Sequence, residues 1–406
     1  MKILRIIARL NVGGPARHVV WLTKELQDDE FQSVLIAGTI PEGEADMSYF
    51  AVENGVEPIY IADLSRELSP RDLFALWKIF KQIKAEKPDI IHTHTAKAGT
   101  VGRLAGLMYR WFTWGTLIGR PRQVRIIHTF HGHVFHSYYS KLKTQAFVVI
   151  EKLLARIATN RIIVLSDQQL SEINGEFGIG NRNQFEVIPL GIDLSRFSNV
   201  DSDRDALRDE IRAQNDEIVV GFVGRLTEIK NISYLLKVAS IYLTKLDSQN
   251  KKLKFVIVGD GNLRQTLTKE CESLGINDIV SFLGHRPDIF DLISGMDVIA
   301  LTSLNEGTPL SLIEAMAAGK PVISTAVGGV VDLLGAVESE EAGFQICERG
   351  VTVTSNSPED FLHGLNCLAE NEQLRKRLAD AGKLFVVENY STHRLVNDMR
   401  SLYHGC

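Results

Sequence analysis

Short runs of aliphatic and β-branched residues alternate with helical patterns along the sequence, and this rhythm occurs twice. In the first half the runs are 2–7, 33–38, 58–63, 89–95, 124–132 and 161–166, with a helical pattern at 71–87. In the second half they are 217–226, 253–260, 279–285, 297–303 and 321–327. Strands that alternate with crossover helices form parallel sheets covered on both faces. The sequence therefore predicts an α/β protein with two doubly wound, Rossmann-like domains.

The length of the chain supports this division. At 406 residues the chain is too long for one ordinary core. A polar stretch at 189–210 with little apolar periodicity is the expected linker, and we place the domain boundary near Phe197. The predicted domains are residues 1–197 and 198–385, followed by a C-terminal segment at 386–406.

Composition narrows the class of protein. The chain is 45% hydrophobic and 23% charged, as in globular domains. Its four cysteines lack metal-ligand or disulfide spacing, which favours a reducing compartment. The first predicted strand follows Met1 directly, so no signal peptide is expected. Since no uncharged apolar run approaches about 18 residues, we expect a cytoplasmic protein whose membrane contact, if any, is peripheral.

Ligands of open α/β sheets bind beyond the carboxyl ends of the strands, so the loops that follow strands are the candidate sites. Two domains that face each other would place these loops in a central cleft. Residues 1–200 hold 24 Lys and Arg against 20 Asp and Glu, whereas the whole chain has a net charge of −5. The first domain is therefore basic, and an anionic ligand is the better match for it.

The stretch "NEGTPLSLIEAMAAGKP", from 305 to 321, predicts a helix that starts beside two carboxylates. Thr308 suits the N-cap and Pro309 the first helical position, and the helix should run to Gly319. Glu306 then lies in the preceding loop and Glu314 in the second turn. A carboxylate accepts two hydroxyl hydrogen bonds at once, as a sugar diol offers. The alternative is an ordinary capped helix with a surface glutamate.

Backbone amides and cations extend this candidate site. We expect free N–H groups on Leu310 and Ser311 at the start of the helix, where anions or hydroxyls bind. In "VGRLTEIKN", Arg225 and Lys230 follow the first strand of the second domain and could hold a diphosphate. Solvated surface charge is the alternative for both. The "VGDG" turn lacks the third glycine of a dinucleotide fingerprint, so it predicts a tight turn.

The first domain offers a glycine pair and a histidine. Gly13 and Gly14 precede a helix and would let backbone amides approach a phosphate or sugar, although a plain glycine turn explains them equally well. His131 stands just past a strand, where it can donate a hydrogen bond or carry a proton. His92 and His94 alternate on a strand without an acidic partner. We therefore expect no metal site.

Another motif is a DxD match at Asp201 and Asp203, the form that a metal-diphosphate site can take. It falls in the expected linker and does not follow a strand. We interpret it as solvated charge.

The order of these motifs resembles family 4 of the retaining glycosyltransferases, the glycosyl transferases group 1, which have the GT-B fold. The resemblance rests on the glycine pair, "HTFHG", "GRL" with a downstream "KN", "VGDG" and "EGTPLSLIEAMAAGKPVI", and it spans nearly the whole chain. It implies that the first domain binds the acceptor and the second a nucleotide sugar. It also implies that the last helix, in 386–406, crosses back to the first domain.

The resemblance assigns roles by position. It implies that Glu314 binds ribose hydroxyls and that Arg225 and Lys230 bind the diphosphate. The donor sugar would meet Glu306 and the backbone of Gly307, Thr308, Pro309 and Leu310. His131 would contact the donor sugar near the reacting carbon, Gly13 and Gly14 would abut the phosphates, and the loop around Arg286 would hold the base.

The implied reaction moves a hexose or N-acetylhexosamine to an acceptor hydroxyl with retention, without a metal or other cofactor. In the front-face displacement discussed for this family, the leaving diphosphate helps to deprotonate the acceptor. Similarity of "THTAKAG" and "HTFHGHVF" to envelope-polysaccharide enzymes suggests a UDP-linked donor. A sugar-nucleotide 2-epimerase of the same fold and an inactive sugar-nucleotide-binding subunit are the alternatives.

One tract of the first domain suggests a partner. From 90 to 150 there is no Asp or Glu, eight Lys and Arg are present, and "YRWFTW" interleaves aromatics with arginine. Such composition is typical of a membrane interface. We expect docking on anionic lipid and a polyprenyl-diphosphate-linked acceptor, whereas the alternative is a basic helix with buried aromatics. With a pI near 6.2 and no nucleic-acid motif, nucleic acid is not an expected partner.

Overall fold

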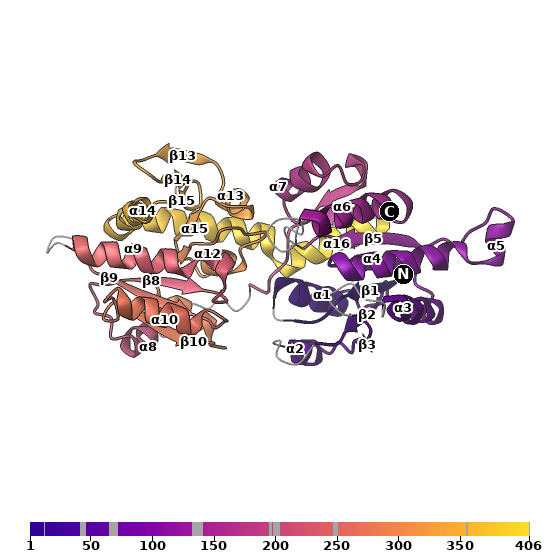
Figure 1. The fold of residues 1–406 in the computed structure, drawn as a ribbon, viewed down its shortest axis with the longest axis horizontal. Coiled ribbons are helices and arrows are strands. Elements are labelled where there is room, and N and C mark those ends of the chain that lie inside the picture. Colours follow the sequence, from indigo (N-terminus) through magenta and orange to yellow (C-terminus); the bar gives the residue numbers. More distant parts are fainter. Residues whose placement is uncertain are drawn as a thin grey trace. The chain divides into compact units, whose positions relative to one another are not determined.

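The computed structural model describes residues 1–11, 13–40, 46–64, 72–131, 141–194, 197, 204–246, 251–354 and 356–405, with the backbone alone at 141–143. The chain forms two compact units (Figure 1). Unit 1 comprises Met1–Ile192 and Thr392–Cys406, and unit 2 comprises Asp193–Ser391. Each unit is described by itself.

Unit 1 alternates strands and helices. Its strands are β1 (Lys2–Ile7), β2 (Gln32–Gly38), β3 (Ile59–Ile61), β4 (Ile90–His94), β5 (Arg125–Thr129), β6 (Arg161–Val164) and β7 (Phe185–Val187). Its helices are α1 (Gly14–Glu25), α2 (Ser48–Glu53), α3 (Asp72–Glu86), α4 (Ala96–Trp111), α5 (Trp114–Leu117), α6 (Lys141–Ile157), α7 (Asp167–Leu170) and α16 (Thr392–Gly405). A π-helix at Ser171–Glu176 and a 3-10 turn at Arg182–Gln184 complete the described elements.

The described strands of unit 1 form one parallel sheet in the order β3-β2-β1-β4-β5-β6-β7. Strand β1 pairs with β2 on one side and with β4 on the other. The loops after β1 and β4 therefore leave the sheet at its topological switch point, where open α/β sheets bind ligands.

Strand alternation divides the core of unit 1 between the two faces of the sheet. Leu4 and Ile6 of β1 pack in a cluster with residues of α3 and α4. Ile3 packs in a second cluster with residues of α1 and α16, and Ile7 joins α1 and α2. Because successive strand residues point to opposite faces, a strand such as β1, with buried aliphatic residues on both faces, requires helices on both sides.

The chain returns to unit 1 for its last helix. Leu395, Met399 and Tyr403 of α16 are buried in the cluster that contains Ile3 of β1. The Arg394 guanidinium donates hydrogen bonds to the carbonyls of Pro189 and Leu190, each at 2.8 Å. Apolar packing and these bonds hold α16 on the unit in which the chain begins.

Unit 2 also alternates strands and helices. Its strands are β8 (Ile218–Val223), β9 (Leu253–Val258), β10 (Val280–Gly284), β11 (Val298–Leu301), β12 (Val322–Thr325), β13 (Val337–Glu340), β14 (Gln345–Cys347) and β15 (Gly350–Val353). Its helices are α8 (Arg204–Glu210), α9 (Ile232–Lys245), α10 (Arg264–Ser273), α11 (Ile289–Gly295), α12 (Leu310–Ala317), α13 (Gly329–Leu334), α14 (Pro358–Glu370) and α15 (Glu372–Tyr390), with a 3-10 turn at Glu228–Lys230.

The sheet of unit 2 has the order β10-β9-β8-β11-β12-β15-β14-β13 over the described strands. Strands β8 to β12 and β15 pair in parallel. At one edge of the sheet, β14 pairs antiparallel with both β13 and β15. The switch point lies between β8 and β11, which pair directly. The loops after these two strands are thus the candidate ligand loops of unit 2.

The predicted α/β class, two Rossmann-like sheets of mainly parallel strands, is confirmed. One local prediction is wrong, and one feature was missed. Residues 204–210 of the expected linker form α8, because Leu207 is buried and Arg208 donates a hydrogen bond to Asp297 at 2.9 Å. The antiparallel strands β13 and β14 were not predicted. Among the described residues, no helix is long and apolar enough to cross a membrane.

Candidate functional site

The two loops at the switch point of unit 2 are joined by hydrogen bonds. The hydroxyl of Thr302, just after β11, donates to the carbonyl of Lys230 at 3.1 Å. The backbone N–H of Leu304 donates to the carbonyl of Ile229 at 2.8 Å. These bonds fix the loop that carries Arg225 and Lys230 against the loop that carries Glu306.

Glu306 is a buried carboxylate with two partners. The Lys230 ammonium and the Ser303 hydroxyl both donate to its Oε1, each at 2.5 Å. The residue is only 9% exposed, so its charge requires such partners. The structure thus brings together Lys230 and Glu306, which the sequence placed in separate motifs.

Two consecutive glycines, Gly328 and Gly329, pack against the backbone of the Glu306 loop. A Cβ on Gly328 would lie 1.9 Å from the carbonyl oxygen of Glu306, and one on Gly329 would lie 2.1 Å from that of Gly307. The N–H of Gly329 donates to the Glu306 carbonyl at 2.9 Å. Because no side chain fits there, residues 328 and 329 hold the backbone of 306–307 in place. Sequence reasoning missed this pair, although "GG" shortly after a strand is a visible signal.

The start of α12 differs from the prediction by one residue. Pro309 occupies the N-cap position with φ −78° and ψ 82°, and no side chain caps the helix, so Thr308 is not the N-cap. The N–H of Leu310 donates to the Thr308 carbonyl at 2.9 Å and is therefore not free. This tight turn satisfies the first amide. Of the two predicted free amides, only that of Ser311 lacks a backbone acceptor among the described residues.

The remaining predicted residues of unit 2 occupy different settings. Glu314 is half-buried on the second turn of α12, as its position in the sequence predicts. Arg225 is exposed directly after β8, and its guanidinium has no ion-pair partner in the part of the chain that the structure describes. An unpaired guanidinium at a strand's carboxyl end is available for an anionic ligand.

Arg286 is already engaged. Its guanidinium forms two hydrogen bonds with the carboxylate of Glu210, at 2.9 and 3.0 Å, and two with that of Asp288. These bonds raise the pKa of Arg286 above its usual value. Its side chain therefore joins the end of α8 to the start of α11, and the structure does not bring it to the Glu306 cluster.

The "VGDG" turn packs directly on the "GRL" loop. A Cβ on Gly259 would lie 1.9 Å from the carbonyl oxygen of Gly224, and the N–H of Leu226 donates to Asp260 at 3.0 Å. The glycines of this turn thus permit close contact between two loops, which supports the predicted tight turn.

In unit 1 the glycine pair lies at the start of α1. Gly13 occupies the N-cap position and Gly14 is the first helical residue, followed by Pro15. Among the described residues, a Cβ on Gly13 would meet only Pro15 within 4 Å. Gly13 therefore leaves space for a ligand beside the backbone at the N-terminal end of this helix.

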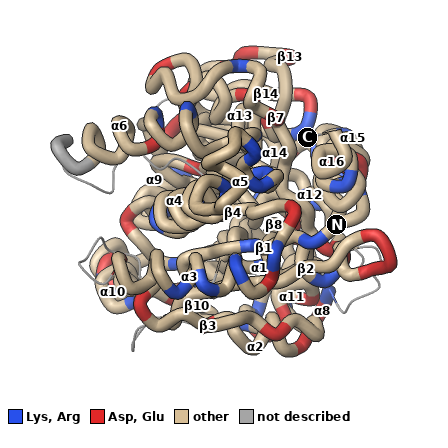
Figure 2. Tube along the Cα trace, turned by 90° about the vertical axis from the view of Figure 1, so that its right-hand side faces the viewer, with Lys and Arg blue, Asp and Glu red and all other residues tan. Residues whose placement is uncertain are grey.

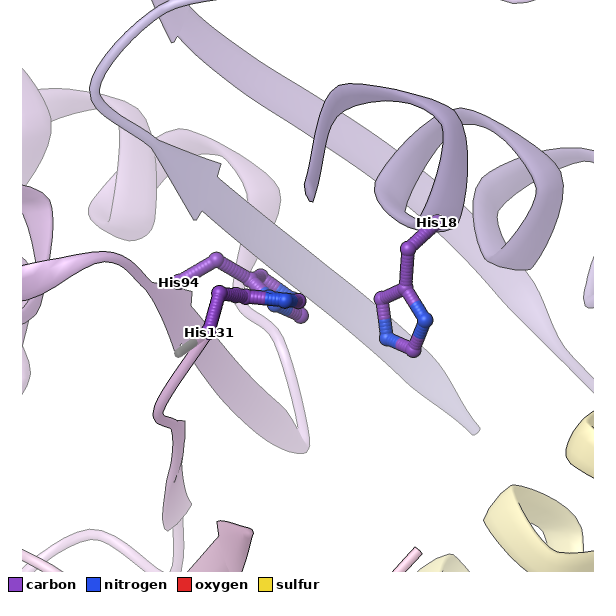
Figure 3. Close-up of side chains that lie close together, drawn as sticks. All are labelled: His18, His94 and His131. Atoms are coloured by element: carbon purple, nitrogen blue, oxygen red, sulfur yellow. The ribbon is translucent and has the colours of Figure 1, made fainter. Parts of the chain in front are cut away.

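His131 lies beside two other histidines that come from separate elements (Figure 3). His94 ends β4 and His18 lies one turn into α1, and the three rings point toward one another. His94 Nδ1 and His131 Nε2 are 3.0 Å apart and share a hydrogen bond. Sequence reasoning missed His18, because only the packing of α1 on the sheet reveals it.

Burial keeps these imidazoles neutral. It lowers the pKa of His131 to about 3 and is the largest cause that lowers the pKa of His18 and His94 well below the usual value. Each ring keeps one buried nitrogen, His18 Nδ1, His94 Nε2 and His131 Nδ1, without a hydrogen-bond partner in the described residues.

Backbone strain marks the same place. Thr95 follows His94 and has φ 70° and ψ 155°, a conformation that non-glycine residues rarely adopt. Its hydroxyl is buried without a hydrogen-bond partner among the described residues. Strain of this kind occurs preferentially at functional sites.

His92, the other strand histidine, has a structural role. Its Nδ1 lies 2.7 Å from the Tyr403 hydroxyl and its Nε2 lies 2.7 Å from the Thr129 hydroxyl. Both ring nitrogens are thus occupied, and the residue ties α16 to the sheet. The DxD pair, Asp201 and Asp203, lies outside the described residues.

Comparisons with known proteins follow this division of the chain. The family model described as "Glycosyltransferase Family 4" matches residues 12–196, and "Glycosyl transferases group 1" matches residues 203–385. The chain belongs to the family 4 glycosyltransferases, glycosyl transferases group 1, and it has their GT-B fold of two Rossmann-like sheets.

Relatives and solved structures agree with the family. The UDP-Gal:alpha-D-GlcNAc-diphosphoundecaprenol alpha-1,3-galactosyltransferase of Escherichia coli is 27% identical over 378 residues, 90% of each chain. The putative glycosyltransferase EpsD of Bacillus subtilis is 25% identical and covers 82% of this chain and 81% of its own. The crystal structure of Anabaena HepE in complex with UDP has a TM-score of 0.78 at 21% identity and covers 100% of both chains.

Proposed function

We propose that this glycosyltransferase moves a hexose or N-acetylhexosamine from a UDP-sugar to a hydroxyl of a lipid-linked acceptor in cell-envelope glycan synthesis. The printed name of the E. coli relative contains a UDP-linked donor and a diphosphoundecaprenol acceptor. HepE has been solved with UDP and, separately, with UDP-glucose. These names support the donor and acceptor classes proposed here.

The observation that carries the donor site is the cluster of Lys230, Ser303 and Glu306 at the switch point of unit 2. A buried carboxylate with two donors on one oxygen keeps its other oxygen for ligand hydroxyls. We assign the donor sugar to Glu306 and to the backbone of 307–310, and the ribose diol to Glu314. Arg225 and Lys230 would bind the diphosphate, and Arg286, held by two carboxylates, would contribute only through its loop.

The proposed reaction retains the anomeric configuration by front-face displacement. The bond from the anomeric carbon to the diphosphate oxygen breaks, and the acceptor oxygen bonds on the same face. The acceptor proton passes to the departing diphosphate. Charge grows on the diphosphate as it leaves, so Arg225 and Lys230 stabilise the transition state more than the bound donor. No step of this proposal requires a metal ion.

The alternatives are separable by products. A 2-epimerase would convert the UDP-sugar to its epimer without an acceptor, and an inactive subunit would bind the donor without turnover. We expect UDP release from purified protein only when a polyprenyl-diphosphate glycan is supplied, with the sugar found on the lipid. An epimer formed without acceptor, or donor binding without UDP release in the presence of any acceptor of this class, would reject the transferase proposal.

We also propose that unit 1 docks on anionic lipid through the segment between α4 and β5. Four large side chains there are strongly exposed: Phe112 67%, Trp114 87%, Leu117 77% and Ile118 73%. Arg110, Arg120 and Arg122 flank α5 in the sequence, where the trace near the α5 label is blue in Figure 2, and Arg120 is exposed. Exposed aromatic and aliphatic residues beside cations match the chemistry of an anionic bilayer surface.

Vesicle sedimentation tests this docking. Binding to vesicles with anionic lipid should exceed binding to neutral vesicles and should weaken with salt, because each cation contributes about 1 kcal/mol near the surface. Trp114→Ser and Leu117→Ser should reduce it. Leu384→Ser is the matched control, since Leu384 is 71% exposed on α15 of unit 2. Equal binding by wild type and both α5 variants would reject this surface.

A further inference from the structure

The three-histidine cluster of unit 1 has a composition that sugar binding does not explain. His18, His94 and His131 come from α1, from the end of β4 and from just past β5 (Figure 3). One ring nitrogen from each lies within 4.8 Å of those from the other two. A sugar contact at His131 would need one imidazole, whereas the structure gathers three.

The spacing of the nitrogens suits a metal ion. Ligand nitrogens on a tetrahedral ion with bonds of about 2.0 to 2.1 Å are roughly 3.3 Å apart. His94 Nδ1 and His131 Nε2 are 3.0 Å apart, so this pair needs to separate by only a few tenths of an ångström. The ring centroid of His18 is 5.0 Å from that of His131 and 5.8 Å from that of His94. A modest rotamer shift of His18 would bring in a third ligand.

The protonation state of the cluster also suits a metal. Metal ligands must be neutral imidazoles, and burial already lowers the pKa of all three rings below the usual range. Each ring has a buried nitrogen without a partner among the described residues. A neutral ring can therefore move its proton to one nitrogen and present the lone pair of the other to an ion.

We propose that His18, His94 and His131 bind one zinc-like transition-metal ion through three imidazole nitrogens. Imidazole donors suit Zn²⁺, Co²⁺, Ni²⁺ and Cu²⁺, whereas Mg²⁺, Ca²⁺ and Mn²⁺ prefer oxygen ligands. Three imidazoles leave the fourth position of a tetrahedral ion open, and a water or hydroxide is the expected fourth ligand.

The site has a regulatory consequence that rests on the proposed function. If His131 contacts the donor sugar, an ion that holds its nitrogen takes that contact away. Zn²⁺ should then inhibit transfer, and a chelator should restore the rate. The ion is thus an inhibitor in this proposal and takes no part in the reaction, so binding and catalysis can be tested separately.

The binding test uses tag-free, full-length protein and Co²⁺ alone. We expect one equivalent of Co²⁺ to give the intense visible absorption of a four-coordinate site, which hydrated Co²⁺ lacks, and Zn²⁺ to displace it. His18→Gln and His94→Gln should weaken binding by at least about tenfold. His363→Gln is the matched control, because His363 is exposed on α14 of unit 2.

Thermal unfolding is the second measurement, because a cooperative transition shows whether each variant is folded. Zn²⁺ should raise the melting temperature of wild type and of His363→Gln, and not that of His18→Gln, which removes one of the three imidazoles. Failure of wild type to bind Co²⁺ in a saturable one-to-one complex, or equal binding by folded His18→Gln, overturns the site. If chelator-treated, metal-free wild type transfers no sugar but still binds one equivalent of Co²⁺ when it is added, that result counts against the proposed function alone.

Discussion

At the scale of single residues, Lys230 has two anionic partners, one observed in the structure and one proposed. Its ammonium neutralises the buried carboxylate of Glu306, and we assign it to the leaving diphosphate. An anionic ligand would therefore compete with Glu306 for Lys230. Because Glu306 holds part of the ammonium's interaction in the bound state, Lys230 should interact more strongly with the diphosphate as its charge grows, which favours the transition state over the ground state.

Lys230→Ala should lower kcat more than donor affinity. The expected loss in kcat is roughly 100- to 1,000-fold, the usual effect of removing one group that stabilises developing charge. Steady-state kinetics with a UDP-sugar and calorimetric donor binding measure the two effects. Lys237→Ala, which changes an exposed lysine on α9, is the control. Equal losses in kcat and in donor affinity would mean that Lys230 binds ground and transition states alike.

At the scale of elements, the loop after β11 depends on the start of α13. Gly328 has φ 52°, and a Cβ there would overlap the carbonyl of Glu306. Gly275 has φ 66°, yet a Cβ there would meet nothing within 4 Å. A side chain at either position would bear the cost of a left-handed backbone. Only at position 328 would it also collide with the carbonyl of Glu306.

This pair gives a matched prediction. Gly275→Ala should cost about 1 to 2 kcal/mol of unfolding free energy from the backbone alone. Gly328→Ala should cost more and should also weaken UDP-sugar binding, because the added methyl group displaces the Glu306 loop. Denaturant unfolding and donor titration of both variants provide the comparison. Identical losses of stability with unchanged donor binding in Gly328→Ala would show that the loop does not depend on this contact.

Much of the element pattern could be predicted because the buried strands carry their own signal. The predicted strand 2–7 is β1, since a strand covered on both faces is rich in aliphatic residues, here Ile3, Leu4, Ile6 and Ile7. Helix α8 could not be predicted, because its seven residues are mostly charged and tertiary contacts fix them, among them the burial of Leu207 and the bond from Arg208 to Asp297. The N-cap at Pro309 was missed for a similar reason, since propensity favours Thr308.

The candidate site also has a part that the sequence predicted and a part that it did not. Glu306 and Lys230 follow strands of one sheet, and the loops after β8 and β11 meet because these strands are neighbours. His18 lies 76 residues before His94 and 113 before His131 in the sequence. Nothing in a helical pattern states which residue of α1 faces which strand, so the three-histidine cluster required the packed structure.

At the scale of the whole molecule, the two units differ in their buried histidines. Among the described residues of unit 1, burial lowers the pKa of His18, His92, His94 and His128 well below 6.5 and that of His131 to about 3. Unit 2 contains only His285 and His363, and both are exposed. The response of the units to acid should therefore differ.

The sign follows from proton uptake. In the unfolded chain these histidines bind protons near pH 6.5, whereas in the folded unit they stay neutral, so the free energy of unfolding falls as pH drops below about 6.5. The upper limit is about 1.4 kcal/mol per pH unit for each histidine. Hydrogen exchange at pH 7.5 and 5.5, corrected for intrinsic rates, should show earlier loss of protection in unit 1. Equal or earlier loss in unit 2 would contradict this assignment.

The assignment of the donor to unit 2 has one direct test, calorimetric titration of UDP into tag-free wild type, Glu314→Gln and Lys237→Ala. We expect one molecule of UDP per chain in wild type and in Lys237→Ala. Glu314→Gln should bind on the order of 10- to 150-fold more weakly, because a hydrogen bond to a charged acceptor contributes about 1.5 to 3 kcal/mol. Absence of UDP binding in wild type, or unchanged affinity in Glu314→Gln, would contradict the proposed donor site.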